Sequence, residues 1–242
     1  MTSLVHKLGL SPTLAFHDVW SIDDPEILSF VPRPANALLL LFPVSKAYET
    51  SRMEEDADKP EYDGTGAEPV IWYKQTIRNA CGLIGVLHAV SNGSSRNLIG
   101  RVISAHAKEM LIAMIEHDSD LYQLINDATP LRPVDRANLL YKSKALETAH
   151  ASAASEGQSS APDANDDIDL HFVCFVKDEK NHLWEMDGRR KGPIDRGQLK
   201  HEEDVLSEKA LNLGPRKFIQ REIAISGGEL RFSLITLAPS FG

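Results

Sequence analysis

Two apolar segments stand out along the chain. Residues 36–43 are apolar at almost every position, with four consecutive leucines from Leu38 to Leu41 and flanking prolines. Such a run predicts a short strand that is buried on both faces of a sheet. Residues 81–90 are equally apolar but have the length of a helix, which predicts a central buried helix. Gly82 and Gly85 would weaken this helix in isolation, so we expect other elements to pack closely against its backbone.

Weaker signals predict the other elements of the first 150 residues. Asp24 before Pro25 supplies a carboxylate cap and a proline in the first turn, which favours a short helix there. The remaining expectations are a charged connector with one or two helical turns (45–69), a short strand (71–74) and two helices (98–124 and 133–153).

The last 70 residues show strand patterns. Residues 170–177 and 182–187 predict a hairpin joined by the turn sequence Asp-Glu-Lys-Asn. Helices are expected at 202–213 and 216–225, interrupted by Gly-Pro, and a final strand at 230–237. Helices early and paired strands late predict an α+β fold with a mainly antiparallel sheet, instead of alternating βαβ units.

Residues 151–167 differ in composition from the rest of the chain. They are rich in Ala, Ser, Asp and Gly and contain no large apolar residue, which predicts a flexible loop. Between Ala145 and Val176 there are six acidic residues and no Lys or Arg.

The totals exclude several function classes. No run of about 18 apolar residues occurs, and the first ten residues contain no apolar stretch of signal-peptide length, so we expect a cytoplasmic protein without a membrane partner. The net charge of −9 disfavours nucleic acid and suits a basic partner. Two cysteines make no disulfide framework, and without Cys-x-x-Cys or His-Glu-x-x-His we expect neither metal nor cofactor.

Cys81 is the candidate nucleophile. It begins the buried helix, where the helix dipole and free N–H groups favour a thiolate. A structural cysteine is the alternative, because free thiols are often buried. Cys174 lies in the middle of the strand Phe-Val-Cys-Phe-Val, and we expect it to be a core residue.

A thiol nucleophile also needs a base, a group that orients the base and oxyanion donors. His88 is seven residues after Cys81, which is about 10 Å along a helix and too far for a hydrogen bond, so we expect a core histidine. A three-residue hairpin connection would place His171 opposite Asp187 on one face, whereas a two-residue connection would separate them. Gln75 could donate its amide to an oxyanion.

These residues lie within segments that resemble the ubiquitin C-terminal hydrolases. Residues 74–89, Lys-Gln-Thr-Ile-Arg-Asn-Ala-Cys-Gly-Leu-Ile-Gly-Val-Leu-His-Ala, resemble the active-site signature of that family. Leu-Trp-Glu-Met-Asp-Gly-Arg at 183–189 and Leu-His-Phe at 170–172 resemble its Asp and His segments. Similarity continues at 31–43, 134–137, 149–158 and 230–232, and therefore covers nearly the whole chain.

The resemblance implies a fold and a set of roles. The fold would be that of a papain-like cysteine hydrolase, and residues 1–242 would form a single catalytic domain. Members of this family are also knotted. Cys81 would attack the carbonyl of the C-terminal glycine of ubiquitin, His171 would be the base, Asp187 would orient it, and Gln75 would stabilise the oxyanion. Residues 151–167 would be a crossover loop that arches over the cleft and admits only small or unfolded adducts.

Two departures from the family and several alternatives remain. Residues 98–117 are longer than in its short members, and Gly214-Pro215 interrupts a late helix. The modifier could be a ubiquitin-like protein such as Nedd8, or the chain could bind and stabilise ubiquitin with little turnover. In either case we expect a monomer. A serine hydrolase is disfavoured because no Gly-x-Ser-x-Gly occurs, and Gly64-x-Gly66 lacks the third glycine of a dinucleotide loop.

Overall fold

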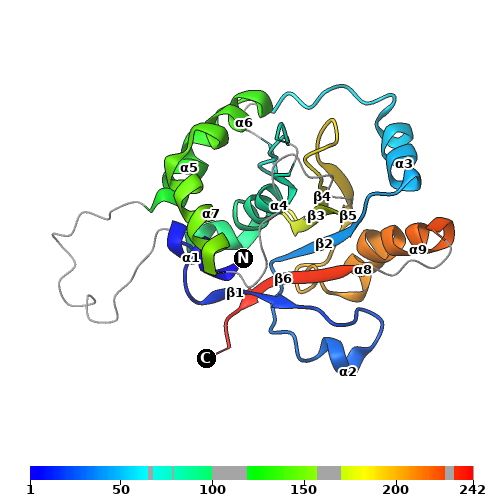
Figure 1. Ribbon diagram of the computed structural model, residues 1–242. Coiled ribbons are helices and arrows are strands. Elements are labelled where there is room, and N and C mark those ends of the chain that lie inside the picture. The colour runs from blue at the N-terminus through cyan, green and yellow to red at the C-terminus, as the bar shows by residue number, and fades with distance from the viewer. Residues whose placement is uncertain (65–67, 78, 100–118, 157–169, 227–231, 242) are drawn as a thin grey trace.

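A six-stranded sheet forms the centre of the computed structural model (Figure 1). The structure describes residues 1–64, 68–77, 79–99, 119–156, 170–226 and 232–241. All neighbouring strands are antiparallel, in the order β1-β6-β2-β3-β4-β5. Their bounds are β1 Leu14–Asp18, β2 Ala37–Pro43, β3 Leu170–Lys177, β4 His182–Met186, β5 Ile194–Gln198 and β6 Ser233–Pro239. The expected antiparallel α+β architecture is confirmed.

Strand β2 lies in the interior of the sheet and is buried on both faces, as its sequence predicts. Leu38, Leu40 and Phe42 belong to one hydrophobic core, whereas Ala37 and Leu39 belong to another on the opposite face. Alternation along the strand explains this division, because successive side chains of a strand point to opposite faces. A run that is apolar at every position therefore joins the two cores.

Helices cover both faces of the sheet (Figure 1). Four of them carry residues of the core that contains Leu39, namely α1 Thr2–Leu8, α4 Cys81–Val90, α5 Asp120–Ala128 and α7 Lys144–Glu156. The core that contains Leu40 is completed by residues of α3 Lys46–Asp56, α8 Glu208–Leu213 and α9 Pro215–Ser226. The remaining elements are α2 Pro25–Leu28, the 3-10 helix η1 Gly93–Leu98 and α6 Pro133–Lys142.

The predicted helix at residues 81–90 coincides with α4. It packs against β2 and β3. A methyl group on Gly82 would lie 3.4 Å from the Phe172 ring, and one on Gly85 would lie 3.4 Å from Leu39 and 3.5 Å from Phe172, which are ordinary van der Waals distances. Other elements therefore pack against this helix, as expected, but not so closely that glycine is required.

Helix α3 is longer than the one or two turns expected between residues 45 and 69. It spans 11 residues and begins where the Ser45 hydroxyl accepts the Tyr48 N–H at 2.9 Å. Tyr48 is the anchor of this helix, because only 1% of its surface is exposed. The prediction was too short because the segment is highly charged. The helix is stabilised by one cap and by one buried aromatic ring, which its composition does not indicate.

The strand expected at residues 71–74 does not form, and this prediction was wrong. Side chains near the end of α4 take the hydrogen bonds that a neighbouring strand would supply. Asn92 accepts the Ile71 N–H at 2.7 Å and donates to its carbonyl at 3.0 Å, while His88 Nε2 accepts the Tyr73 N–H at 2.9 Å. Residues 71–73 are therefore buried without joining the sheet.

The helix expected at residues 133–153 is divided into α6 and α7. Ser143 separates them with an extended ψ of 107°, and its hydroxyl accepts the Leu146 N–H at 3.3 Å. Helix α7 continues to Glu156, so residues 151–156 are helical and not part of a loop. Three alanines in that stretch favour a helix, since alanine has the highest helix propensity. Residues 157–167 of the expected loop lie outside the described residues.

Other boundaries differ modestly. Of the helix expected at 98–124, residues 100–118 lie outside the described residues, and α5 contains 120–124. Helix α8 begins at Glu208 and not at 202, because the Ser207 hydroxyl caps it through the Ala210 N–H. The interruption at Gly214-Pro215 separates α8 from α9, as expected. In the described ranges, no helix is long and apolar enough to cross a membrane.

Candidate active site

Cys81 is the first residue of α4, and its side chain is partly buried. Its Sγ atom lies 4.0 Å from the Leu170 carbonyl oxygen at the start of β3. The thiol therefore lies where the free N–H groups of a helix N-terminus meet the first residue of the interior strand β3. Ala80, in the cap position, makes no side-chain hydrogen bond to the helix.

His171 and Asp187 form a buried pair next to this thiol. The Nε2 atom of His171 lies 2.8 Å from Oδ1 of Asp187, and the side chains are only 2% and 0% exposed. Because the carboxylate accepts from Nε2, Nδ1 is the ring nitrogen left for the thiol. The structure thus brings together the predicted Cys, His and Asp residues.

The predicted register of the hairpin was wrong by two residues. The ladder pairs Cys174 with Met186 and Lys177 with Leu183, so position 171 does not face position 187 directly. The connection is longer than three residues because the Asp178 carboxylate accepts the N–H groups of Lys180 and His182, both at 2.8 Å. A shift of two residues keeps each side chain on its face, so the His171–Asp187 contact survives it.

Asp187 accepts hydrogen bonds at both carboxylate oxygens. Oδ1 also accepts the Arg189 N–H at 2.9 Å, and Oδ2 accepts the Tyr48 hydroxyl at 2.5 Å. Its backbone carbonyl accepts from the Trp72 indole at 3.1 Å. Sequence reasoning did not find Tyr48, whose only signal is that it is an aromatic residue in a charged segment, and it placed Trp72 in the expected strand.

The neighbouring charges shift the pKa values of the three groups. Burial opposes charge on Cys81, but the His171 hydrogen bond and charge outweigh burial and lower the pKa of the thiol. Burial likewise opposes charge on His171, but the Asp187 carboxylate raises its pKa to about 9. The pKa of Asp187 lies below its usual range, because His171 and Tyr48 outweigh the effect of burial. Each shift favours a thiolate, an imidazolium and a carboxylate.

Gln75 lies next to the turn that carries Asp187. Its N–H donates to the Gly188 carbonyl at 2.8 Å, and its side-chain amide donates to the Ile77 carbonyl at 2.9 Å. A methyl group on Gly188 would approach the Gln75 Cβ atom at 2.9 Å, so glycine permits this contact. The structure places Gln75 beside the segment that leads to Cys81, with its amide nitrogen on Ile77.

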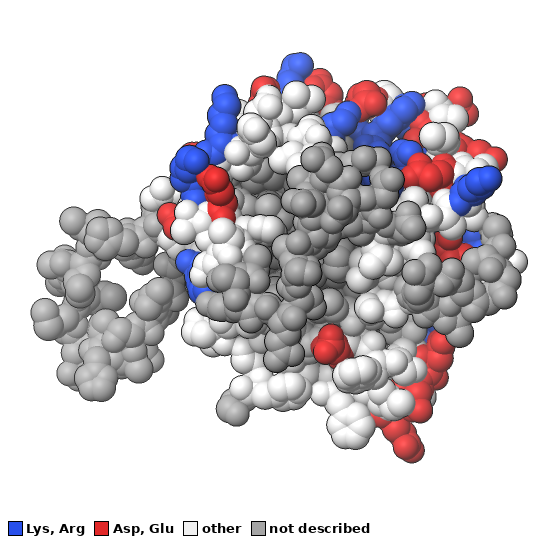
Figure 2. Space-filling view, viewed as in Figure 1, with Lys and Arg blue, Asp and Glu red and all other residues white. Residues whose placement is uncertain are grey.

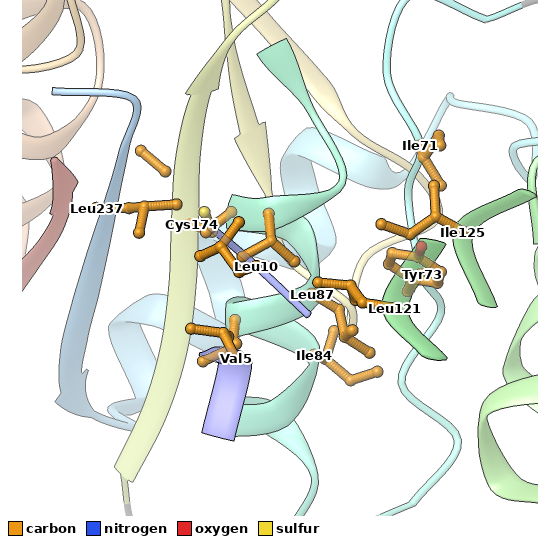
Figure 3. Close-up of a cluster of buried hydrophobic side chains, with 14 of the residues drawn as sticks. Val5, Leu10, Ile71, Tyr73, Ile84, Leu87, Leu121, Ile125, Cys174 and Leu237 are labelled. Carbon is orange, nitrogen blue, oxygen red and sulfur yellow. The ribbon is translucent and has the colours of Figure 1, made fainter. Parts of the chain in front are cut away.

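His88 and Cys174 lie in the core, as expected. Burial lowers the pKa of His88 to about 3, and its Nε2 atom accepts the Tyr73 N–H. Burial raises the pKa of the Cys174 thiol. Figure 3 shows Cys174 among apolar side chains that include Leu237, Leu10 and Leu87. Neither residue has the surroundings of a reactive group.

A metal centre is not found in the part of the chain that the structure describes. There, no group of three or more His, Cys, Asp or Glu side chains could hold a metal ion.

Comparison with solved structures identifies the class of fold. The chain is similar to the catalytic domain of UCH37 from Trichinella spiralis, which was crystallised bound to ubiquitin vinyl methyl ester. The TM-score is 0.69 at 18% identity, and the match covers 99% of this chain and 91% of that domain. The fold is accordingly the papain-like α+β fold that the family resemblance implies.

Comparison with sequences identifies the family. A model described as ubiquitin carboxyl-terminal hydrolase, family 1, matches residues 1–220. Ubiquitin carboxyl-terminal hydrolase isozyme L1 of Rattus norvegicus is 34% identical over 238 residues, covering 98% of this chain and 93% of that protein. Ubiquitin carboxyl-terminal hydrolase 3 of Arabidopsis thaliana is 33% identical, covering 98% and 89%. The chain belongs to the ubiquitin C-terminal hydrolases, and the predicted enzyme class, a cysteine-type hydrolase, is confirmed.

Proposed function

We propose that this enzyme removes small or unfolded adducts from the C-terminal glycine of ubiquitin, with Cys81, His171 and Asp187 as a catalytic triad and Gln75 as an oxyanion donor. The observation that carries the proposal is the contact of a thiol at a helix N-terminus with a buried histidine–aspartate pair, in a chain of this family. We further propose that residues 1–242 form one catalytic domain that acts as a monomer.

The first half of the reaction forms a thioester. The thiol proton resides on His171, and the Cys81 thiolate attacks the carbonyl carbon of the terminal glycine. The oxyanion accepts hydrogen bonds from the backbone N–H of Cys81 and from the side-chain amide of Gln75. To make this bond, the Gln75 amide gives up its hydrogen bond to the Ile77 carbonyl. His171 then protonates the leaving group as the bond to the adduct breaks.

The second half releases ubiquitin. His171 removes a proton from water, which attacks the thioester and expels the Cys81 thiolate. Asp187 keeps the imidazole in one orientation and stabilises its positive charge in both halves. The lowered pKa of Cys81 supports this cycle, since a thiolate is both the better nucleophile and the leaving group of the second half.

Charge supports ubiquitin as the partner. The enzyme carries a net charge of −9, and six acidic residues lie between Ala145 and Val176 without a basic residue. The C-terminal tail of ubiquitin, Leu-Arg-Leu-Arg-Gly-Gly, is basic and would be attracted. Figure 2 shows acidic side chains at the lower right of one face, and further acidic side chains mixed with Lys and Arg along its upper rim.

A ubiquitin-like modifier is the second candidate. The triad reports the chemistry and not the modifier, so a Nedd8 hydrolase would have the same site. Parallel assays with C-terminal fluorogenic derivatives of ubiquitin and Nedd8 test the proposal. We expect the higher kcat/KM with ubiquitin, and a higher value with Nedd8 would overturn the choice of modifier.

A carrier that binds ubiquitin with little turnover is the alternative from another class. Measuring affinity for ubiquitin beside turnover separates it from an enzyme. We expect Cys81→Ala to retain affinity within several-fold and to lose turnover. Tight binding by a wild-type protein that turns over no faster than Cys81→Ala would support the carrier instead.

A further inference from the structure

Tyr48 makes a contact in the site that the proposed cycle does not use. Its hydroxyl donates to Oδ2 of Asp187, and the ring lies 5.7 Å from the His171 ring between centroids. The side chain is 1% exposed, so it cannot contact a protein substrate. Its effect must therefore pass through its neighbours.

The hydrogen bonds to Asp187 divide between its two oxygens. His171 and the Arg189 N–H both use Oδ1, whereas Tyr48 is the side chain bonded to Oδ2. A carboxylate held at one oxygen can rotate about its Cβ–Cγ bond, but a carboxylate held at both has one orientation. The direction of the Oδ1 bond to His171 therefore depends on Tyr48.

We propose that Tyr48 is a positioning residue for the hydrolysis catalysed by the Cys81 thiol. Its hydroxyl fixes the Asp187 carboxylate in the plane that aligns Oδ1 with Nε2 of His171. The inference rests on the proposed function and extends it from the triad to helix α3. A sequence comparison limited to Cys, His, Asp and Gln would not find this residue.

The structure holds Tyr48 through both its backbone and its ring. Its backbone N–H is capped by Ser45, whose hydroxyl donates to Glu222 of α9 at 2.5 Å. Its ring packs edge-on against Phe42 at 4.9 Å and lies 6.0 Å from Phe218. The cap and the ring contacts thus hold Tyr48 at the start of α3, with its hydroxyl on Asp187.

The far end of α3 is bound to the turn after Asp187. Arg190 is 1% exposed in its side chain and pairs with Glu55 at 2.7 Å and with Asp56 at 3.0 Å. Removing one partner of such a buried cluster leaves an uncompensated charge. The cluster therefore maintains the distance between the helix that carries Tyr48 and the turn that carries Asp187.

Several charged groups face this contact from the surrounding elements. Arg52 of α3 and Arg189 interact with Tyr48, His171 of β3 contacts Asp187, and His88 of α4 lies within its field. Burial and the Asp187 charge raise the pKa of Tyr48, so its hydroxyl is a neutral donor across the working pH range. Tyr48 thus supplies a hydrogen bond and no charge.

Tyr48→Phe tests the proposal by removing only the hydroxyl. Tyr73→Phe is the matched control, because Tyr73 is also fully buried and its hydroxyl bonds Ser91 at 2.9 Å, away from the triad. We expect Tyr48→Phe to lower kcat about 10- to 100-fold with KM unchanged, the range for losing a buried bond to a charged group. Tyr73→Phe should retain kcat within about two-fold at similar thermal stability.

A second readout needs no ubiquitin. The rate of Cys81 alkylation by iodoacetamide, followed by peptide mass mapping across pH, reports the thiolate. We expect Tyr48→Phe to shift the profile to higher pH, since a misaligned Asp187 stabilises the imidazolium less. A wild-type protein without turnover would overturn the proposed function, while the alkylation profiles would still decide the role of Tyr48.

The double variant Tyr48→Phe/Asp187→Ala shows whether the hydroxyl acts through the carboxylate. It buries no unpaired carboxylate, so it remains measurable even if Tyr48→Phe alone is unstable. We expect its kcat and its alkylation profile to equal those of Asp187→Ala. A further loss in that background, equal losses in Tyr48→Phe and Tyr73→Phe, or a wild-type profile in Tyr48→Phe would each overturn the proposal.

Discussion

His171 bonds Asp187 just beyond the paired end of the β3–β4 hairpin, whose last ladder pair is Cys174 with Met186, and Nε2 and Oδ1 are separated by 2.8 Å. In the same register continued past that end, the two positions would be diagonal neighbours on one face, within reach of long side chains. Both side chains are almost fully buried, so salt screens their attraction little. The pair can therefore hold its charge state beside a thiol that is open to substrate.

We expect loss of the base to cost more than loss of the group that orients it. His171→Ala should lower kcat/KM about as much as Cys81→Ala, because the triad acts as a unit. Asp187→Ala should cost less, within the range of about 10²–10⁴-fold that general acid–base catalysis contributes. Steady-state kinetics with a fluorogenic ubiquitin derivative measures both.

The matched control for these variants is His182→Ala. His182 also pairs with an aspartate, Asp195, at 2.7 Å, but this pair lies at the surface. The His182→Ala variant should retain wild-type kinetics. If a folded His88→Ala variant lost activity while His171→Ala stayed active, the assignment of His171 as the base would be wrong.

The pH dependence of turnover should follow the charge of His171. Its pKa is raised to about 9 while that of Cys81 is lowered, so the thiolate–imidazolium pair exists between the two values. The value of kcat/KM, which reports the free enzyme, should decline as the pH rises through about 9, where His171 loses its proton. In Asp187→Ala burial dominates, and the alkaline decline of kcat/KM should move to lower pH. A pH profile of kcat/KM with an unmoved alkaline limb would contradict this expectation.

Stability should show the same linkage. The folded pKa of His171 lies above its unfolded value of about 6.5. Its charged interaction with Asp187 therefore contributes its full stabilisation of the folded state below the unfolded pKa of about 6.5, and this stabilisation is lost as the pH rises through the folded pKa. The difference in free energy of unfolding between wild type and Asp187→Ala, measured in urea, should be larger at about pH 5.5 than at about pH 9.5.

Gln75 should matter for the first chemical step. Gln75→Ala should lower the acylation rate about 10²–10³-fold, the range for losing one oxyanion donor. Gly188→Ala should also slow acylation, because its methyl group would meet the Gln75 Cβ atom at 2.9 Å. Pre-steady-state kinetics measures the step, and Gln198→Ala at the end of β5 is the exposed-amide control. A wild-type acylation rate for Gln75→Ala would remove this residue from the site.

The size of the adduct tests the crossover loop expected from the sequence. Inserting about ten Gly/Ser residues after Ser159 adds little loop-closure free energy, so the fold should persist. If the loop filters substrates, the longer variant should begin to cleave diubiquitin and should still process small adducts. Gel assays of diubiquitin cleavage measure this, and a folded, active variant that still excludes diubiquitin would count against the filter.

The sequence predicts elements whose burial is uniform and misses those that depend on partners. Strand β2 and helix α4 are apolar at nearly every position, so their burial did not depend on where other elements lie. Residues 71–74 have the composition of a strand, but His88 and Asn92 satisfy their backbone groups instead. Only the folded chain reveals that exchange.

The same limit applies to the site. A two-residue shift in the β3–β4 register was invisible to turn rules, yet side-chain alternation preserved the pairing of His171 with Asp187. Tyr48 lies 139 residues from Asp187 in sequence, and nothing local to either residue indicates their contact. Short-range patterns identify reactive groups, whereas the groups that hold them in place require the tertiary structure.

The central claim is that Cys81 attacks the C-terminus of ubiquitin. Ubiquitin bearing a C-terminal thiol-reactive group tests it directly, because one adduct reports both the partner and the attacking sulfur. Mass mapping of the labelled protein should locate ubiquitin on Cys81, and Cys174→Ala should label like wild type while Cys81→Ala should not label. An adduct on Cys174, or labelling that persists in Cys81→Ala, would contradict the account.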